Sequence, residues 1–158
     1  LIKSGALNGY LHNRITAKTF DSKPTGNGRA HALGNKIIPR MTNTYIGNGD
    51  SSFEEMLSGI KKGYYLKRSS GGQVDPSTGE FLFNALESFS IENGELGLRV
   101  KGVSMIGNIL TTLKEISLLG KDMAIEGGGA CGKSGQYVLT GDGSPHMRID
   151  KVKIGGTD

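Results

Sequence analysis

Glycine is the feature that most constrains how this chain can fold. It supplies 26 of the 158 residues, about twice its ordinary share of a protein sequence. The glycines follow no three-residue period and only four prolines accompany them, so neither a collagen-like helix nor a proline-rich disordered tract fits. They separate short apolar runs instead, which predicts many turns and therefore many short strands. Since tryptophan is absent and aromatic residues make up 6% of the chain, the core has to be built from aliphatic side chains and methionine.

Two segments carry the signals of a helix. The first, residues 52–63, starts with Ser52, and a glutamate follows three residues later, which is the capping-box pattern. The second, residues 108–120, starts with Asn108, a good N-cap, and continues with an apolar stripe. A shorter helical piece is expected over residues 14–20.

The clearest strand signal is a hairpin over residues 80–103. Asn93 and Gly94 form the dipeptide that is typical of a type I′ turn. After the turn, Leu96 and Leu98 belong to an alternation of apolar residues with polar residues and glycine. This alternation predicts a strand with one buried face and one solvent-exposed face.

Residues 36–46 are rich in β-branched residues and are predicted to form one strand. Pro39 cannot donate a hydrogen bond to a neighbouring strand, so an edge position is expected, to which an extended peptide could add. The strand segments run together rather than alternating with helices. The predicted fold class is therefore α+β, mainly antiparallel β-sheet with two principal helices, in a single domain over residues 1–158.

Composition and charge argue against several classes of protein. The net charge of +4 is spread without a basic run, so no nucleic-acid partner is expected. No apolar stretch approaches the ~20 residues of a membrane-spanning helix, so no membrane partner is expected. A lone cysteine cannot form an internal disulfide, which favours a reducing compartment. Because Leu1 is not an initiator methionine, we expect the C-terminal part of a longer protein.

The stretch GGGACGKSGQ, residues 127–136, fits the phosphate-binding loop pattern of many nucleotide-hydrolysing enzymes. That loop works only where it opens a helix, whose N-terminus faces the phosphates. Here Ser134 is followed by QYVLTGDGSP, which contains β-branched residues, glycines and a proline and cannot supply a helix of useful length. The match is therefore interpreted as a coincidence, with no nucleotide bound at Lys133.

Cys131, the one cysteine of the chain, lies in the same stretch. Residue chemistry alone leaves three interpretations open. A free cysteine is most often a small buried residue. It could be a nucleophile if His12, His31 or His146 lay beside it, or it could be a metal ligand, although one cysteine and three scattered histidines have no ligand spacing.

The blocks around this stretch resemble the TldD/PmbA family of zinc metallopeptidases, and its TldD-type branch in particular. GYLHNRITA, GNGRA, PRMTNTYIGNG, GGQVDPSTGEFLF and IENGELGLRVKGVSMIG occur in the order in which the family has them. GGGACGKSGQ and SPHMRIDKVKIGGT resemble the C-terminal end of that family. The resemblance extends over nearly the full length of the chain.

The resemblance implies a role for Cys131 as a zinc ligand. In TldD-like proteins the other protein ligands are the two histidines of a His-Glu-x-x-x-His motif, whose glutamate is the general base. That motif precedes the region represented here, and no His-Glu pair occurs in these residues. The resemblance therefore implies Zn²⁺ in the full-length protein, with no catalytic residue, zinc or activity in this piece alone.

Further functional expectations follow from the resemblance. Arg40, Asn43, Gln73 and Asp75 lie in family-like blocks and are expected to contact a peptide substrate, although Gln73 and Asp75 could equally stabilise the turn in VDPSTG. The resemblance also implies a cytoplasmic protein that works as a homodimer or as a heterodimer with a PmbA-like subunit. Extended or unfolded peptides are the expected substrates, because such a peptide could add to an exposed strand edge. The alternatives are a non-catalytic interaction or dimerisation module and a cysteine hydrolase that uses Cys131.

Overall fold

The structure is a computed structural model that describes residues 1–156, apart from the side chains of residues 126 and 127. The chain forms two compact units. We call Leu1–Gly47 with Met123–Ser144 the first unit, and Asn48–Asp122 with Pro145–Asp158 the second unit. Residues 123–144 are thus an excursion that leaves the second unit and returns to it.

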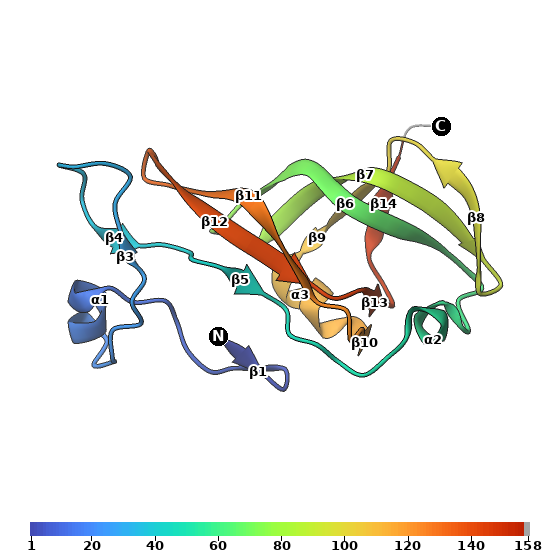
Figure 1. The fold of residues 1–158 in the computed structure, drawn as a ribbon, viewed down its shortest axis with the longest axis horizontal. Helices are drawn as coiled ribbons and strands as arrows, with labels where there is room; N and C mark the ends of the chain where they lie inside the picture. Colours follow the sequence, from blue (N-terminus) through green and yellow to red (C-terminus); the bar gives the residue numbers. More distant parts are fainter. Residues whose placement is uncertain (157–158) are drawn as a thin grey trace. The chain divides into compact units, whose positions relative to one another are not determined.

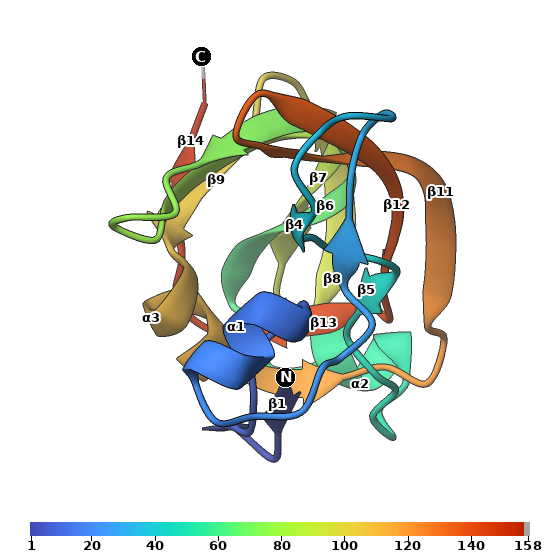
Figure 2. The same ribbon diagram turned by 90° about the vertical axis from the view of Figure 1, so that its left-hand side faces the viewer.

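One antiparallel sheet dominates the second unit. Its long hairpin, drawn in green in Figure 1, consists of β6 (Lys62–Val74) and β7 (Glu80–Glu92). β7 also pairs with β8 (Glu95–Val100) and with β9 (Ser104–Asn108), and β14 (Lys153–Gly155) pairs with β9. The resulting strand order, β14-β9-β7-β6, appears in Figure 2 as a curved sheet.

Two short helices and a small sheet complete the second unit. Helix α2 (Phe53–Leu57) precedes β6, and helix α3 (Ile109–Lys114) follows β9. Strands β10 (Ile116–Leu119) and β13 (Met147–Ile149) pair with each other antiparallel. Met56 of α2 is buried, so the helix contributes one large side chain to the core.

The first unit is built on a second long hairpin, drawn in orange and red in Figure 1. Strand β11 (Ala124–Lys133) pairs antiparallel with β12 (Gln136–Ser144), and β5 (Thr44–Tyr45) joins β12 in parallel. The strand order is β11-β12-β5, which places β11 at an edge. The remaining elements are short: β1 (Ile2–Lys3), β2 (Ala6–Leu7), α1 (Arg14–Thr19), β3 (Gly28–Arg29) and β4 (Ile38–Pro39).

The predicted fold class is confirmed, because the sheets are mainly antiparallel and the three helices among the described residues are short. The predicted caps are also confirmed. Ser52 and Glu55 form the capping box of α2, and Asn108 accepts hydrogen bonds from the first turn of α3. None of these helices, within residues 1–156, is long and apolar enough to span a membrane.

Both principal helices end earlier than predicted. Helix α2 ends at Leu57 because the next residues bond to the turn between β7 and β8. The carbonyls of Ile60 and Lys61 accept hydrogen bonds from the amides of Gly94 and Asn93, at 2.8 and 3.0 Å. The second predicted helix ends in the same way, since its C-terminal part becomes β10 and pairs with β13. Tertiary pairing has overridden local helix preference.

The predicted hairpin is confirmed, but its buried face is not. Asn93 and Gly94 have φ angles of 52° and 84°, as a type I′ turn requires. However, Leu98 is 83% exposed and Leu96 is 43% exposed. Among the described residues β8 pairs with β7 alone, and no further layer buries these leucines.

The prediction of one strand over residues 36–46 is wrong. Ile38–Pro39 pairs with Gly28–Arg29, whereas Thr44–Tyr45 pairs with β12. The two short strands belong to different sheets. Arg40 lies between them, and its amide donates to the carbonyl of Asn27. This segment is therefore not a continuous edge to which a peptide could add.

The chain exposes more surface than compact proteins of its mass. Its accessible surface is 11268 Å², whereas a compact 16.7 kDa protein exposes about 7,600 Å². Two separate compact bodies of the observed sizes would expose only about 9,200 Å² in total. Several large apolar side chains are among the exposed residues, including Leu33, Leu98 and Leu139.

Candidate functional site

Cys131 lies on a strand rather than in a loop. It belongs to β11 and pairs with Val138 of β12. The turn that joins the strands is formed by Ser134 and Gly135, whose φ angles are 51° and 70°. Gly132, next to Cys131, has no room for a side chain without the ring of Tyr137 yielding, because an added Cβ would lie 3.1 Å from that ring.

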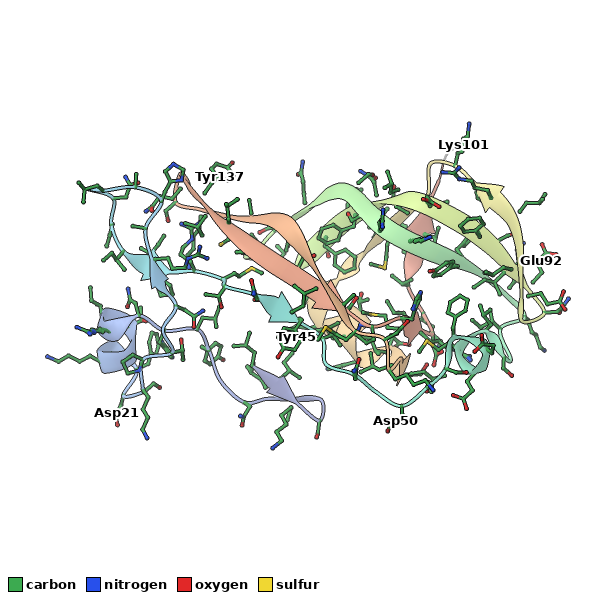
Figure 3. The ribbon with its side chains drawn as sticks, in the orientation of Figure 1. Asp21, Tyr45, Asp50, Glu92, Lys101 and Tyr137 are labelled. Atoms are coloured by element: carbon green, nitrogen blue, oxygen red, sulfur yellow. The ribbon has the colours of Figure 1, made fainter. Side chains whose placement is uncertain are left out.

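This hairpin excludes the phosphate-loop geometry. Strand β12 follows Ser134 and Gly135 directly, so no helix N-terminus faces a phosphate. Lys133 pairs with Gln136 across the turn, and its ammonium donates to the carbonyl of Pro39 at 3.3 Å. Figure 3 labels Tyr137, which is 66% exposed at this tip.

Arg40 contacts Cys131 from the buried side. Arg40 is 1% exposed. Nε donates to the sulfur of Cys131 over 3.4 Å, and Nη2 donates to the carbonyls of Cys131 and Gln136. The structure thus brings together two of the residues predicted from the family-like blocks, Arg40 and Cys131. The guanidinium of Arg40 faces the sulfur of Cys131 and is not exposed at the surface.

Buried amides hold this arrangement together. Asn27 and Gln136 are 5% and 8% exposed. The side chain of Asn27 donates to the carbonyl of Arg40, and that of Gln136 donates to the carbonyl of Lys36. The amide of His31 in turn donates to Gln136. The loop between β3 and β4 is therefore joined to the hairpin tip by polar groups that have little contact with water.

The surroundings of Cys131 favour its thiolate. Burial raises the pKa of the thiol, but the hydrogen bonds from Arg40 and from the backbone of Met41, with the charges of Arg40 and Lys133, outweigh it. The pKa of Cys131 therefore lies below its ordinary value. The side chain is partly exposed, so a thiolate here is accessible as a nucleophile or as a metal ligand.

The three histidines are engaged elsewhere. The ring of His12 is bonded to Thr16, and the ring of His31 is bonded to the carbonyl of Tyr137. His146 lies in the second unit, where Asp122 is bonded to its Nδ1. Among the described residues none of these rings hydrogen-bonds to Cys131, and no group of three acidic, histidine or cysteine side chains is arranged to hold a metal.

The other predicted substrate-contact residues have structural partners or lie in the second unit. Asn43 accepts a hydrogen bond from the amide of Gly141 and joins β12 to the segment before β5. Gln73 is exposed on β6. Asp75 caps the turn after β6, where Ser77 donates to it from both its hydroxyl and its amide, and these bonds lower the pKa of Asp75. Asp75 thus stabilises the turn in VDPSTG, which was the alternative to a contact with substrate.

Sequence reasoning missed two features. One is the contact between Arg40 and Cys131, and the signal for it was a lone arginine in an apolar, β-branched stretch. The other is a chain of hydrogen bonds in the second unit, from Asp122 through the ring of His146 to the hydroxyl of Tyr65 at 2.8 Å. Burial and the charge of Asp122 raise the pKa of Tyr65, so its hydroxyl stays protonated. No local spacing indicated this chain of bonds.

Comparisons with known proteins agree on one family. A model of the PmbA/TldA metallopeptidase C-terminal domain matches residues 1–156. A metalloprotease of Methanothermobacter thermautotrophicus is 48% identical over 99% of this chain and 34% of its own length. A zinc metalloprotease TldD homolog of Saccharolobus solfataricus is 36% identical over 99% of this chain and 35% of its own length.

A solved structure agrees with the sequence comparisons. TldE from Thermococcus kodakarensis has a TM-score of 0.78 and 26% identity to this chain, covering 99% of it and 33% of the TldE chain. This chain therefore spans about a third of the length of the proteins to which it is similar.

Proposed function

The chain belongs to the PmbA/TldD family of metallopeptidases, as its C-terminal domain, and we propose that it supplies the cysteine ligand of a catalytic zinc site. The full-length protein would be a zinc-dependent peptidase. Two histidines and a glutamate from the preceding part of the protein would complete the site around Cys131. The observation that carries this proposal is the accessible Cys131 thiol of lowered pKa, held by a buried arginine.

The residues present fit one ligand position of such a site. Zinc is bound by thiolate rather than by thiol, so a lowered pKa favours binding. Three protein ligands leave a position for water or substrate, and when bound the metal polarises the carbonyl and activates water.

We further propose that the peptide binds as an added strand along β11. This strand replaces residues 36–46 as the candidate edge, because among the described strands it pairs with β12 alone. Ala130 and Gly132, which flank Cys131, are exposed. Main-chain hydrogen bonds to such an edge hold an extended peptide with little demand on its side chains. Short or unfolded peptides would therefore be preferred to folded proteins.

We propose that the full-length protein works in the cytoplasm as a homodimer or with a PmbA-like subunit. The large exposed apolar surface of this chain supports an assembly of some kind.

Zinc content and activity of the full-length protein test the ligand assignment. Cys131→Ala should lose zinc and peptide hydrolysis together. Val138→Ala is the matched control, because it weakens the hairpin at the residue paired with Cys131 but keeps the sulfur. A Cys131→Ala protein with full zinc and full activity would falsify the assignment. Peptides N-methylated at alternate amides test strand addition, and equal cleavage of both methylation registers would argue against it.

A further inference from the structure

Arg40 has an unusual environment for a charged side chain. It is 1% exposed, although burying a charge without a counter-charge is strongly unfavourable. Among the described side chains no carboxylate forms an ion pair with it. Its Nη1 is buried and has no hydrogen-bond partner in the described part of the chain. An apolar side chain of similar volume would fill the same space without this penalty, so packing alone does not account for an arginine here.

The bonds that Arg40 does make converge on Cys131. Nε donates to the sulfur over 3.4 Å, and Nη2 donates to the carbonyl of the same residue. Nη2 also donates to the carbonyl of Gln136, on the other strand of the hairpin, at 3.0 Å. Because the guanidinium is rigid and planar, these bonds fix the sulfur and the backbone of the hairpin tip in one geometry.

The backbone of Arg40 is itself held in place. Its amide donates to the carbonyl of Asn27 at 2.8 Å, and the side chain of Asn27 donates to its carbonyl at 3.1 Å. Asn27 is 5% exposed. The guanidinium therefore extends from a fixed base, which limits the positions that it and the sulfur can take.

We propose that Arg40 is a positioning residue that presets the position of the Cys131 sulfur for metal binding. The inference rests on the proposed function as far as the metal is concerned, whereas the preset position of the sulfur does not depend on metal. It replaces the direct contact with substrate that the sequence suggested for Arg40. Partners in the outer shell of a metal site typically change metal affinity by about 10- to 100-fold.

Cobalt titration of the full-length protein tests this role. Arg40→Met removes the side-chain hydrogen bonds to Cys131 and Gln136. Arg40→Lys keeps the charge but loses the planar group that holds the sulfur. Arg29→Met is the matched control, because Arg29 donates to the carbonyls of Met41 and Leu139 in the same unit, and no hydrogen bond joins it to Cys131 among the described residues. We expect both Arg40 variants to bind Co²⁺ about 10- to 100-fold more weakly, with a weaker sulfur-to-cobalt charge-transfer band, and Arg29→Met to resemble the wild type.

Two outcomes of the titration would overturn the proposal. One is an Arg40→Lys protein with wild-type affinity and band intensity, and this variant decides the matter if Arg40→Met fails to fold. The other is an equal loss in Arg29→Met, which would mean that general stability of the hairpin is responsible.

Crystal structures of the metal-free proteins give a readout that does not depend on metal. Cys131 should occupy one side-chain rotamer in the wild type and several in Arg40→Lys, and a single unchanged rotamer in the variant would contradict the proposal. If Cys131→Ala binds cobalt as tightly as the wild type, the proposed zinc ligand is wrong. The rotamers then still decide whether Arg40 positions the sulfur.

Discussion

A pair of hydrogen-bonded residues closes the base of the excursion that carries Cys131. Asp122 is the last residue before this excursion, and His146 follows shortly after it. Asp122 accepts a hydrogen bond from the backbone amide of His146 at 3.0 Å and is also bonded to its ring Nδ1. The amide of Gly120 donates to the carbonyl of His146 at 2.8 Å. We therefore expect Asp122→Ala to let this closure open more often.

The size of the effect follows from these contacts. Asp122→Ala removes two hydrogen bonds, each of which contributes about 0.5–1.5 kcal/mol. The side chains of His146 and Asp122 are 38% and 47% exposed, so water competes and the sum falls below the upper limit. The ring of His146 still packs on Phe53, with the ring centroids 4.9 Å apart. We expect a loss of about 1–2 kcal/mol, or roughly 5- to 30-fold more frequent local opening.

Hydrogen exchange in the full-length protein measures this opening directly. The amides of Gly120 and His146 should exchange faster in Asp122→Ala by the factor given above. Asp150→Ala is the control, because Asp150 accepts exposed hydrogen bonds from Arg148 and Ser117 in the same unit. Unchanged exchange at these two amides in Asp122→Ala, or the same acceleration in Asp150→Ala, would refute the reasoning.

The pH dependence of this closure has a definite sign. Hydrogen bonds from the side chain and then the backbone of His146 lower the pKa of Asp122, although slight burial opposes them. A carboxyl whose pKa is lower in the folded state stabilises that state above its ordinary pKa of about 3.9 and loses this contribution as pH falls through the lowered value. The difference between wild type and Asp122→Ala should therefore be complete at neutral pH and should disappear in acid. A difference that stays constant through that range would contradict this account.

Three further outcomes are expected. Residues 1–158 alone should bind no stoichiometric zinc and hydrolyse no peptide, because a catalytic zinc site needs three protein ligands and Cys131 would supply one; elemental analysis that finds one tightly held zinc per chain would contradict this. The full-length protein should bind no ATP at sub-millimolar concentration through Lys133, whose ammonium is bonded to Pro39; a calorimetric signal abolished by Lys133→Ala would show otherwise. The isolated chain should bind a hydrophobic dye more strongly than the full-length protein, because Leu98 and Leu110 are 83% and 68% exposed; equal dye binding would mean that this surface stays uncovered.

Local chemistry was sufficient to predict several elements from the sequence. The capping box at Ser52, the cap at Asn108 and the turn at Asn93 and Gly94 depend on residues only a few positions apart. Such signals involve a side chain and a nearby backbone, so they are readable in a linear sequence. The prediction that no helix follows Ser134 is confirmed for the same reason, since the residues after it form strand β12.

The helix ends and the strand partners could not be predicted in this way. Residues 60 and 61 leave the helix because their carbonyls bond to a turn more than 30 residues away. Residues 36–46 divide between two sheets because β4 pairs with the nearby β3, whereas β5 pairs with β12 near the other end of the chain. Pairing between distant segments depends on the whole fold and leaves little trace in local preference.

The candidate site likewise depends partly on residue identity and partly on contacts between distant segments. The sequence by itself determined that Cys131 is the one cysteine of the chain, in a stretch that resembles the C-terminal end of the family, and that no His-Glu pair accompanies it. Only the tertiary structure decided that Cys131 lies on an edge strand and that Arg40, 91 positions away, donates to its sulfur. The physical reason is that residue identity is local, whereas the burial of a charge and the partner that compensates it exist only once distant segments are packed together.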